Sequence, residues 1–233
     1  MTTSTHDVNE QFVRACIGGH VAAVQATLAQ GADIETIWRS CTGLMWAAAE
    51  GHQAVVALLI ARGSNVNARN EADYDALLYA AESDRRSIVQ MLIEAGAQPD
   101  NRNRYQESIL MIVARYGHTD IVEHLVDQHG ITVDAANHIG NTALYLATEN
   151  GHSHTVSSLA RRGANVNVAN IGGWTPILMA AAQGDLATMS VLIECGAEVN
   201  VCNKWGQTAL SEARQSFRSQ QATALLLEAG ALE

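Results

Sequence analysis

The residues of this 233-residue chain that could carry chemistry are nine histidines, four cysteines and a set of aromatic, arginine and acidic side chains. His152 and His154 stand two residues apart, and side chains at that spacing on a helix point in different directions, so they make a poor pair of metal ligands. The cysteines have no paired metal-ligand spacing, and four thiols in a chain of this length do not make a disulfide scaffold. We therefore predict no metal site and expect reduced cysteines.

The chain shows none of the catalytic signatures that have a local sequence pattern. It has no Gly-rich phosphate loop, no Gly-x-Ser-x-Gly elbow and no His-Glu-x-x-His zinc motif. We therefore predict no cofactor, and function must come from a surface. Aromatic residues and charges of both signs concentrate between residues 38 and 116, a composition expected of a small-molecule site. The alternative interpretation of that concentration is a solvated charged ridge.

A sequence unit that recurs every 33 or 34 residues must position these side chains. Each full copy contains a residue that favours the start of a helix, and these residues are Thr42, Asp75, Ser108, Thr142, Thr175 and Thr208. A glycine closes each copy, at Gly31, Gly63, Gly96, Gly130, Gly163, Gly196 and Gly230. Seven copies fit, the first being abbreviated. In the sixth, the Thr175 oxygen is expected to accept from the first backbone N–H groups, and Pro176 suits the first turn.

Several motifs recur with this period. They are a Thr-Pro-Leu-like helix start, alanine pairs and Gly-His turns, as in Thr175-Pro176-Ile177, Ala47-Ala48, Ala180-Ala181, Gly51-His52 and Gly151-His152. Together they resemble the ankyrin repeat, over roughly residues 5 to 233. The resemblance implies an all-α fold, a solenoid of stacked helix-turn-helix pairs with β-hairpin-like fingers. It also implies one domain over residues 1–233, with repeats at about 7–36, 37–69, 70–102, 103–136, 137–169, 170–202 and 203–233, the terminal ones acting as caps.

Composition limits the partners. A net charge of −10 disfavours nucleic acid, because phosphate backbones are bound mainly by clustered Lys and Arg. No apolar run reaches the length of a spanning helix, so no membrane partner is predicted. The N-terminus has neither the basic region nor the apolar segment of a secretory signal, so we expect a cytoplasmic protein. A repeat stack needs no partner subunit to close its core, and monomer is the default expectation.

Proteins similar to this one usually hold a partner in the concave groove formed by the finger tips and the exposed side of the first helices. The family's exposed positions, transferred onto this chain, are rich in Trp, Tyr and Arg, the residue types that dominate binding hot spots. The expected partner-binding residues are Trp38, Arg39, Trp46, Tyr74, Tyr79, Glu82, Arg104, Tyr105, Glu107, Arg115, Tyr116, His138, Trp174 and Trp205. Trp46 and Tyr79 either form the floor of the groove or belong to the core beneath it. The alternative for the finger aromatics is stacking on the next finger.

Two classes of function remain. The leading hypothesis is a binding module that recognises a partner protein or peptide through its concave finger and inner-helix face. The alternative is a small-molecule-binding protein or an unusual stand-alone enzyme. It would use an aromatic, Arg- and Glu-lined pocket in the concave groove of repeats two to four, with Glu82, Asp73 or Glu107 as acid or base. The lack of a recognisable catalytic motif favours the first hypothesis.

Three expectations concern burial, helix bounds and one loop. The apolar run from Val55 to Ile60 has helical spacing and should be buried on both sides, so Leu58, like Val191 in the sixth repeat, is expected in the core. The helices of the sixth repeat are expected near residues 176–182 and 186–194. The fourth repeat has one extra residue before Gly130, and the loop near His129 should bulge.

Overall fold

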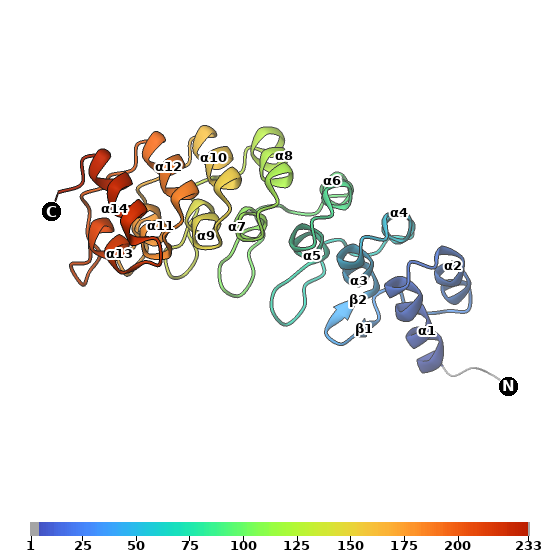
Figure 1. The fold of residues 1–233 in the computed structure, drawn as a ribbon. Helices are drawn as coiled ribbons and strands as arrows, with labels where there is room; N and C mark the ends of the chain where they lie inside the picture. The colour runs from blue at the N-terminus through green and yellow to red at the C-terminus, as the bar shows by residue number, and fades with distance from the viewer. Residues whose placement is uncertain (1–4, 233) are drawn as a thin grey trace. The chain divides into compact units, whose positions relative to one another are not determined.

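The computed structural model describes residues 5–232, which form helices in successive pairs joined by loops (Figure 1). The helices are α1 (Thr5–Ile17), α2 (Val21–Ala29), α3 (Gly43–Glu50), α4 (Gln53–Ala61), α5 (Ala76–Glu82), α6 (Arg86–Glu94), α7 (Ile109–Arg115), α8 (Thr119–His129), α9 (Ala143–Glu149), α10 (Ser153–Arg161), α11 (Pro176–Gln183), α12 (Leu186–Glu194), α13 (Ala209–Gln215) and α14 (Ser219–Glu228). The bounds of α11 and α12 agree with the sequence-based expectation to within one residue. The mostly helical prediction is confirmed.

The loops that precede the first helix of a pair are the fingers. One contains a two-stranded antiparallel sheet, β1 (Ile37–Trp38) and β2 (Cys41–Thr42), in which Trp38 lies opposite Cys41. Two later fingers are closed by single bridges, from Ala136 to Thr142 and from Cys202 to Thr208. The fingers are therefore hairpin-like, with regular strands in one of them among the described residues.

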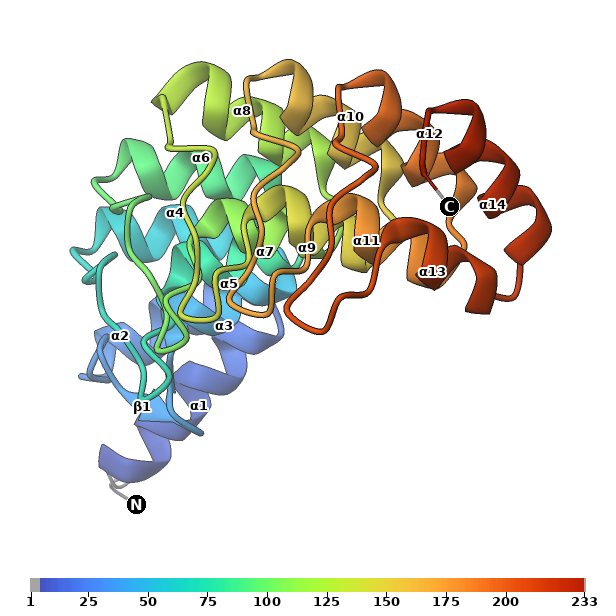
Figure 2. The ribbon, with the colours of Figure 1, turned by 90° about the vertical axis from the view of Figure 1, so that its left-hand side faces the viewer.

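The chain divides into two compact parts, an N-terminal part that ends at Arg104 and a C-terminal part that begins at Tyr105. In the N-terminal part, α3 packs against α1 and α5, and α4 packs against α2 and α6. In the C-terminal part, α7, α9, α11 and α13 form an inner layer, and α8, α10, α12 and α14 form an outer layer (Figure 2). Within residues 5–232, no helix is both long and apolar enough to cross a membrane.

The predicted helix-start residues are the N-caps of the inner helices. Five of them accept a hydrogen bond on the side chain from the backbone N–H three residues later, namely Thr42, Asp75, Ser108, Thr142 and Thr208. Thr175 differs from the expectation, because its buried hydroxyl oxygen has no hydrogen-bond partner within the described residues. The start of α11 therefore depends on Pro176, whose ring fixes φ and whose missing N–H costs nothing in the first turn.

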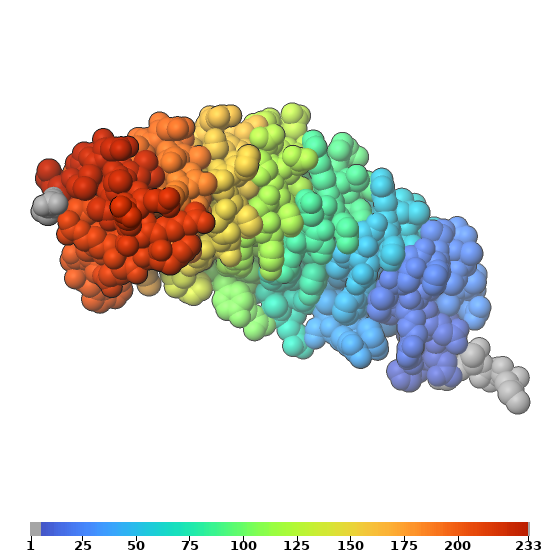
Figure 3. All heavy atoms as spheres, in the orientation of Figure 1, coloured from blue at the N-terminus to red at the C-terminus, as the bar shows by residue number. Residues whose placement is uncertain are grey.

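The core lies between the helix layers, and successive repeats within each part lie directly against one another (Figure 3). Each outer helix contributes side chains to this core from one face only, so the prediction of burial on both sides of α4 is wrong. Leu59 and Leu192 are 0% exposed, whereas Leu58 and Val191 are half-buried and Ala57 is exposed. The outer helices cover the inner layer with one face and meet solvent with the other, so a uniformly apolar sequence does not mean complete burial.

The extra residue of the fourth repeat lengthens a helix and does not make a loop bulge. Helix α8 has 11 residues and continues to His129, whereas α4, α6, α10 and α12 have 9. It ends at Gly130, which adopts the left-handed conformation at φ 60°. That conformation stops a helix without steric penalty when the residue is glycine, so the insertion is absorbed by about half a turn of helix.

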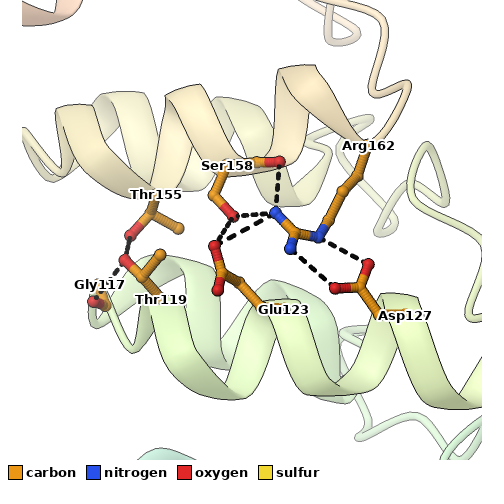
Figure 4. A network of polar contacts seen from close by, with 7 residues as sticks. All are labelled: Gly117, Thr119, Glu123, Asp127, Thr155, Ser158 and Arg162. Atoms are coloured by element: carbon orange, nitrogen blue, oxygen red, sulfur yellow. Dashed lines mark hydrogen bonds and ion pairs between the residues drawn. The ribbon is translucent and has the colours of Figure 1, made fainter.

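A polar network joins α8 to α10 on the outer layer of the C-terminal part (Figure 4). The Arg162 guanidinium donates to Asp127 through two bonds of 2.8 Å and reaches Glu123 at 3.2 Å. The hydrogen bond from Arg162 holds the pKa of Asp127 below its ordinary value. The Thr119 and Thr155 hydroxyls meet at 2.7 Å at the other end of the same interface. The network fixes the register of two neighbouring outer helices.

Two histidines of the Gly-His turns, His52 and His152, each link one repeat to the preceding one. The Nε2 atom of His52 lies 2.8 Å from the Ile17 carbonyl oxygen, and Nε2 of His152 lies 2.9 Å from that of Arg115. These bonds satisfy carbonyls at the ends of inner helices, which have no partner within the helix. These two histidines therefore have a structural role, since each joins neighbouring repeats.

Candidate interaction surface

Four of the fingers are folded around an asparagine side chain. The Oδ1 atom of Asn170 accepts from the backbone N–H groups of Gly172 and Trp174, at 2.9 and 3.1 Å. Asn70, Asn137 and Asn203 make the same pair of bonds in their own fingers. Such a turn fixes the tip without needing regular strands. The sequence analysis missed these residues, although asparagines at 70, 103, 137, 170 and 203 recur with the repeat period and could have revealed them.

Backbone hydrogen bonds join the tip of one finger to the next. In the C-terminal part, the N–H of Ile171 donates to the Ile139 carbonyl at 3.0 Å, and the N–H of Lys204 donates to the Gly172 carbonyl at 3.1 Å. His138 donates to the Tyr105 carbonyl at 3.5 Å, and its Nδ1 atom lies 2.8 Å from the same oxygen. In the N-terminal part, Arg104 donates to Ala72 in the same way. We call this series the finger ladder; it holds the tips in fixed positions.

The aromatic rings of the N-terminal part pair within a repeat. Trp38 of the finger lies 6.0 Å from Trp46 of α3, ring centre to ring centre, and the Trp46 indole N–H donates to the Trp38 carbonyl at 3.2 Å. Tyr74 and Tyr79 make the corresponding pair at 5.2 Å. All four rings are half-buried. A finger aromatic thus stacks on its own inner helix, and this contact covers part of the ring that was expected to meet a partner.

The Tyr79 hydroxyl lies in a partly buried polar contact. It accepts from the Asn70 amide at 2.9 Å and lies 3.3 Å from the sulfur of Cys41. Burial raises the pKa of Tyr79 above its ordinary value, with a smaller contribution from Cys41. This tyrosine is therefore a neutral group that ties the helix to the finger, and it belongs to the floor beneath the surface.

Charged candidates of the N-terminal part lie nearer to solvent. The Arg39 guanidinium lies 4.4 Å from the centre of a Trp38 ring, a cation–π contact, and Arg39 is exposed. The Arg104 guanidinium, also exposed, donates to the carbonyl of Glu71 in the preceding finger. Glu82 is half-buried at the end of α5. The two arginines brace fingers and still present charge to solvent.

In the C-terminal part, Glu107 and Arg115 form an ion pair. Glu107 is 6% exposed and Arg115 is half-buried, and a second contact joins Nη1 of Arg115 to the carboxylate at 3.3 Å. The pair joins a finger to the end of α7. Tyr116, the next residue after that helix, stacks on His118 at 5.9 Å and is 45% exposed.

The most exposed aromatic candidates lie on the fingers of the C-terminal part. Tyr105 is 52% exposed and Trp205 is 69% exposed, and His138 is exposed beside the Tyr105 ring. Trp174 is half-buried. Two residues outside the expected set join them, Ile139 at 38% and Ile171 at 62% exposure. Their signal in the sequence was an isoleucine at a finger position, where a polar residue would be ordinary.

Cavities and titratable clusters add little to these fingers. One cavity of about 420 Å³ lies at the base of the first finger in the N-terminal part, next to Trp38, Ile37 and Glu10. Within residues 5–232, no group of three or more His, Cys, Asp or Glu side chains is arranged to hold a metal ion. Cys16 and Cys41 are buried free thiols, whereas Cys195 and Cys202 are exposed ones.

Comparisons with known proteins agree with this arrangement. The chain matches the family described as ankyrin repeats (3 copies) over residues 12–103, 77–170 and 159–232. The crystal structure of the human ASB11 ankyrin repeat domain is similar, with a TM-score of 0.84 and 25% sequence identity over 95% of this chain and 98% of that one. No curated protein sequence matches. The chain belongs to the ankyrin repeat family, whose fold is a general module for protein–protein interaction.

Proposed function

We propose that the chain is one ankyrin-repeat domain of seven repeats that binds a partner protein or peptide through the face made by its fingers and inner helices. The observation that carries the proposal is the exposure of Tyr105, Ile171 and Trp205 on fingers that the ladder holds in place. Exposed apolar side chains on a rigid support lose little conformational entropy when a partner covers them. Aromatic residues also supply much of the binding energy at interfaces.

Thirteen of the fourteen sequence-predicted residues, all but Glu82, take different roles in this proposal. Tyr105, Tyr116 and Trp205 are contacts for the partner on the C-terminal part, and Arg39 and Arg104 supply charge on the fingers of the N-terminal part. The stacked pairs Trp38–Trp46 and Tyr74–Tyr79, with Trp174, form the floor and expose their edges. His138 and the pair Glu107–Arg115 support the tip and the helix end.

Selection from a random peptide library displayed on phage tests the proposal without a known partner. Peptides selected on the unaltered protein are measured against a double variant, Tyr105→Ser with Ile171→Ser. A matched control carries Phe217→Ser with Leu227→Ser, which removes exposed apolar side chains, 80% and 40% exposed, away from the fingers. We expect the finger variant to bind at least about tenfold more weakly, or about 1.4 kcal/mol, and the control to bind normally. Equal losses in both variants would contradict the proposal.

A further inference from the structure

The turn between α5 and α6 differs in sequence from most turns that join an inner helix to an outer one. In four other repeats this turn carries a Gly-His pair, namely Gly19-His20, Gly51-His52, Gly117-His118 and Gly151-His152. Here Asp84 and Arg85 take the two places, and Arg86 and Ser87 follow as the first residues of α6. Two consecutive arginines therefore stand at this turn, in a protein with a net charge of −10.

Arg85 takes the place of the histidine and leaves most of its donors unused. His52 and His152 reach a carbonyl of the preceding repeat at 2.8 and 2.9 Å. The Nε atom of Arg85 donates to the Ala49 carbonyl at 3.4 Å, a longer link. The side chain lies over Gly51, where a Cβ would come within 2.7 Å of Nε. Within residues 5–232, the Nη groups of this arginine make no hydrogen bond or ion pair, so they are available to a ligand.

A cavity of about 270 Å³ lies beside this turn. It is lined by Gly51 and Gln53 of one repeat and by residues 84–88 of the next. Arg86 is exposed and, like its neighbour, makes no ion pair in the described part of the chain. Asp84 also belongs to the lining, so two arginines and one aspartate give the cavity a net charge of +1. We call residues 84–87 with this cavity the arginine turn.

Arg162 shows how an arginine with a structural role is compensated in this chain, because it pairs with both Asp127 and Glu123. Arg85 and Arg86 place two like charges on adjacent residues without such a partner, and like charges at short range repel each other. A bound anion would offset this repulsion. The planar fork of a guanidinium matches the oxygens of a carboxylate or a phosphate group.

We propose that the arginine turn binds a phosphate group, either free or carried by another molecule. A carboxylate has two oxygens and one charge, whereas a phosphate monoester has three terminal oxygens and about −1.5 to −2 charges at neutral pH, so it suits two guanidiniums better. The Arg85 side chain does not cap α6, and the N-terminal end of a helix adds a favourable potential for an anion. The seven residues of α5, about 10 Å of helix, separate this site from the finger of the same repeat. The site is therefore distinct from the surface of the proposed function and does not depend on it.

Inorganic phosphate is the first probe. It is titrated to tens of millimolar into the ¹⁵N-labelled protein, at a constant ionic strength set with sodium chloride, and backbone amide shifts are followed. We expect saturable shifts centred on residues 85–88. The double variant Arg85→Gln with Arg86→Gln should bind at least about tenfold more weakly, because each guanidinium donates charge-assisted hydrogen bonds. A matched control, Arg62→Gln with Arg161→Gln, removes the same two charges from exposed arginines elsewhere and should bind normally.

A single variant keeps the test independent of folding. Arg86→Gln preserves the contact of Arg85 with the preceding repeat and should still weaken phosphate binding. Absence of saturable shifts at residues 85–88, unchanged binding by the double variant, or an equal loss in the matched control overturns the inference.

Phosphoserine peptides with random flanking residues then distinguish the two sources of the phosphate group. Peptides that compete with inorganic phosphate and bind more tightly than it does indicate a phosphorylated partner protein. Phosphopeptides that compete but bind no more tightly indicate a small phosphate-bearing molecule, and the same peptides without phosphate should not bind at the turn. Phosphopeptides that fail to compete with inorganic phosphate at the turn also indicate the small molecule, provided that the phosphate shifts depend on the two arginines.

Discussion

The geometry of the finger ladder makes a sharp prediction about two glycines. Gly173→Ala and Gly206→Ala introduce the same methyl group at equivalent places, both with positive φ, at 80° and 76°. Each pays about 1–2 kcal/mol for placing an L-residue in the left-handed region, and the effect on the unfolded chain is the same for both. Only at Gly173 does the new Cβ meet backbone, 2.9 Å from the Lys204 nitrogen and 3.1 Å from the Asn203 Cα.

The difference between the two variants therefore isolates the collision. Relief requires the last finger to move by several tenths of an ångström, which lengthens the bond from Lys204 to Gly172. Overpacking of this kind costs about 1–3 kcal/mol. We expect Gly173→Ala to be less stable than Gly206→Ala by that amount in urea unfolding followed by circular dichroism. Hydrogen exchange gives a local measurement, in which the Lys204 amide should exchange faster in Gly173→Ala only. Equal unfolding midpoints together with equal exchange would refute the close approach of the two fingers at Gly173.

Three further predictions concern stability. Leu59→Ala should cost about 2–5 kcal/mol and Leu58→Ala clearly less, as urea midpoints would show; the opposite order would mean that the helix face is wrongly assigned. Asp75→Ala removes an N-cap acceptor 2.9 Å from the Leu78 nitrogen and should cost about 1–2 kcal/mol. Asp75→Thr should restore part of it, since threonine makes this cap bond at three other inner helices. The lowered pKa of Asp127 means that its pairing with Arg162 stabilises the fold above the ordinary carboxyl pKa and is lost as pH falls through the lower folded value. The stability difference between the unaltered protein and Asp127→Asn should therefore shrink between pH 7 and pH 3, and a constant difference would contradict the pairing.

The positions of the inner helices could be predicted because a cap residue has a local physical cause. A hydroxyl or carboxylate that can accept from the first turn marks a helix start wherever it recurs with the period. The buried face of α4 could not be predicted from Val55 to Ile60. The buried face of an amphipathic helix is recognised by the polar residues on its other face, and this run has none. Leu58 and Leu59 are therefore equivalent in the sequence, although their burial differs in the structure.

The surface was harder to predict than the scaffold because exposure depends on where two elements meet. Trp38 and Tyr74 were expected on the surface because they lie on fingers, and a finger position can be recognised from the local sequence. Whether a finger ring is covered depends on the residue that stands four positions after the cap on the inner helix of the same repeat. Trp46 and Tyr79 occupy that position. Rings at both places pack against each other, since tilted aromatic pairs are favourable when their ring centres lie about 4.5–7 Å apart.

The same comparison explains why the Trp205 ring remains exposed. In its repeat, the residue four after the cap is Glu212, whose carboxylate accepts from the Gln207 side chain at 2.6 Å, so α13 offers Trp205 no ring there. Trp205 stands three residues before the cap, as do Tyr105 and Ile139, and all three are exposed. Trp174 stands directly before its cap, as Tyr74 does, and both are half-buried. The position relative to the cap therefore distinguishes side chains that stay exposed at the finger tip from rings that pack against the inner helix. Trp205 occupies the tip position, and α13 has no aromatic residue four positions after the cap.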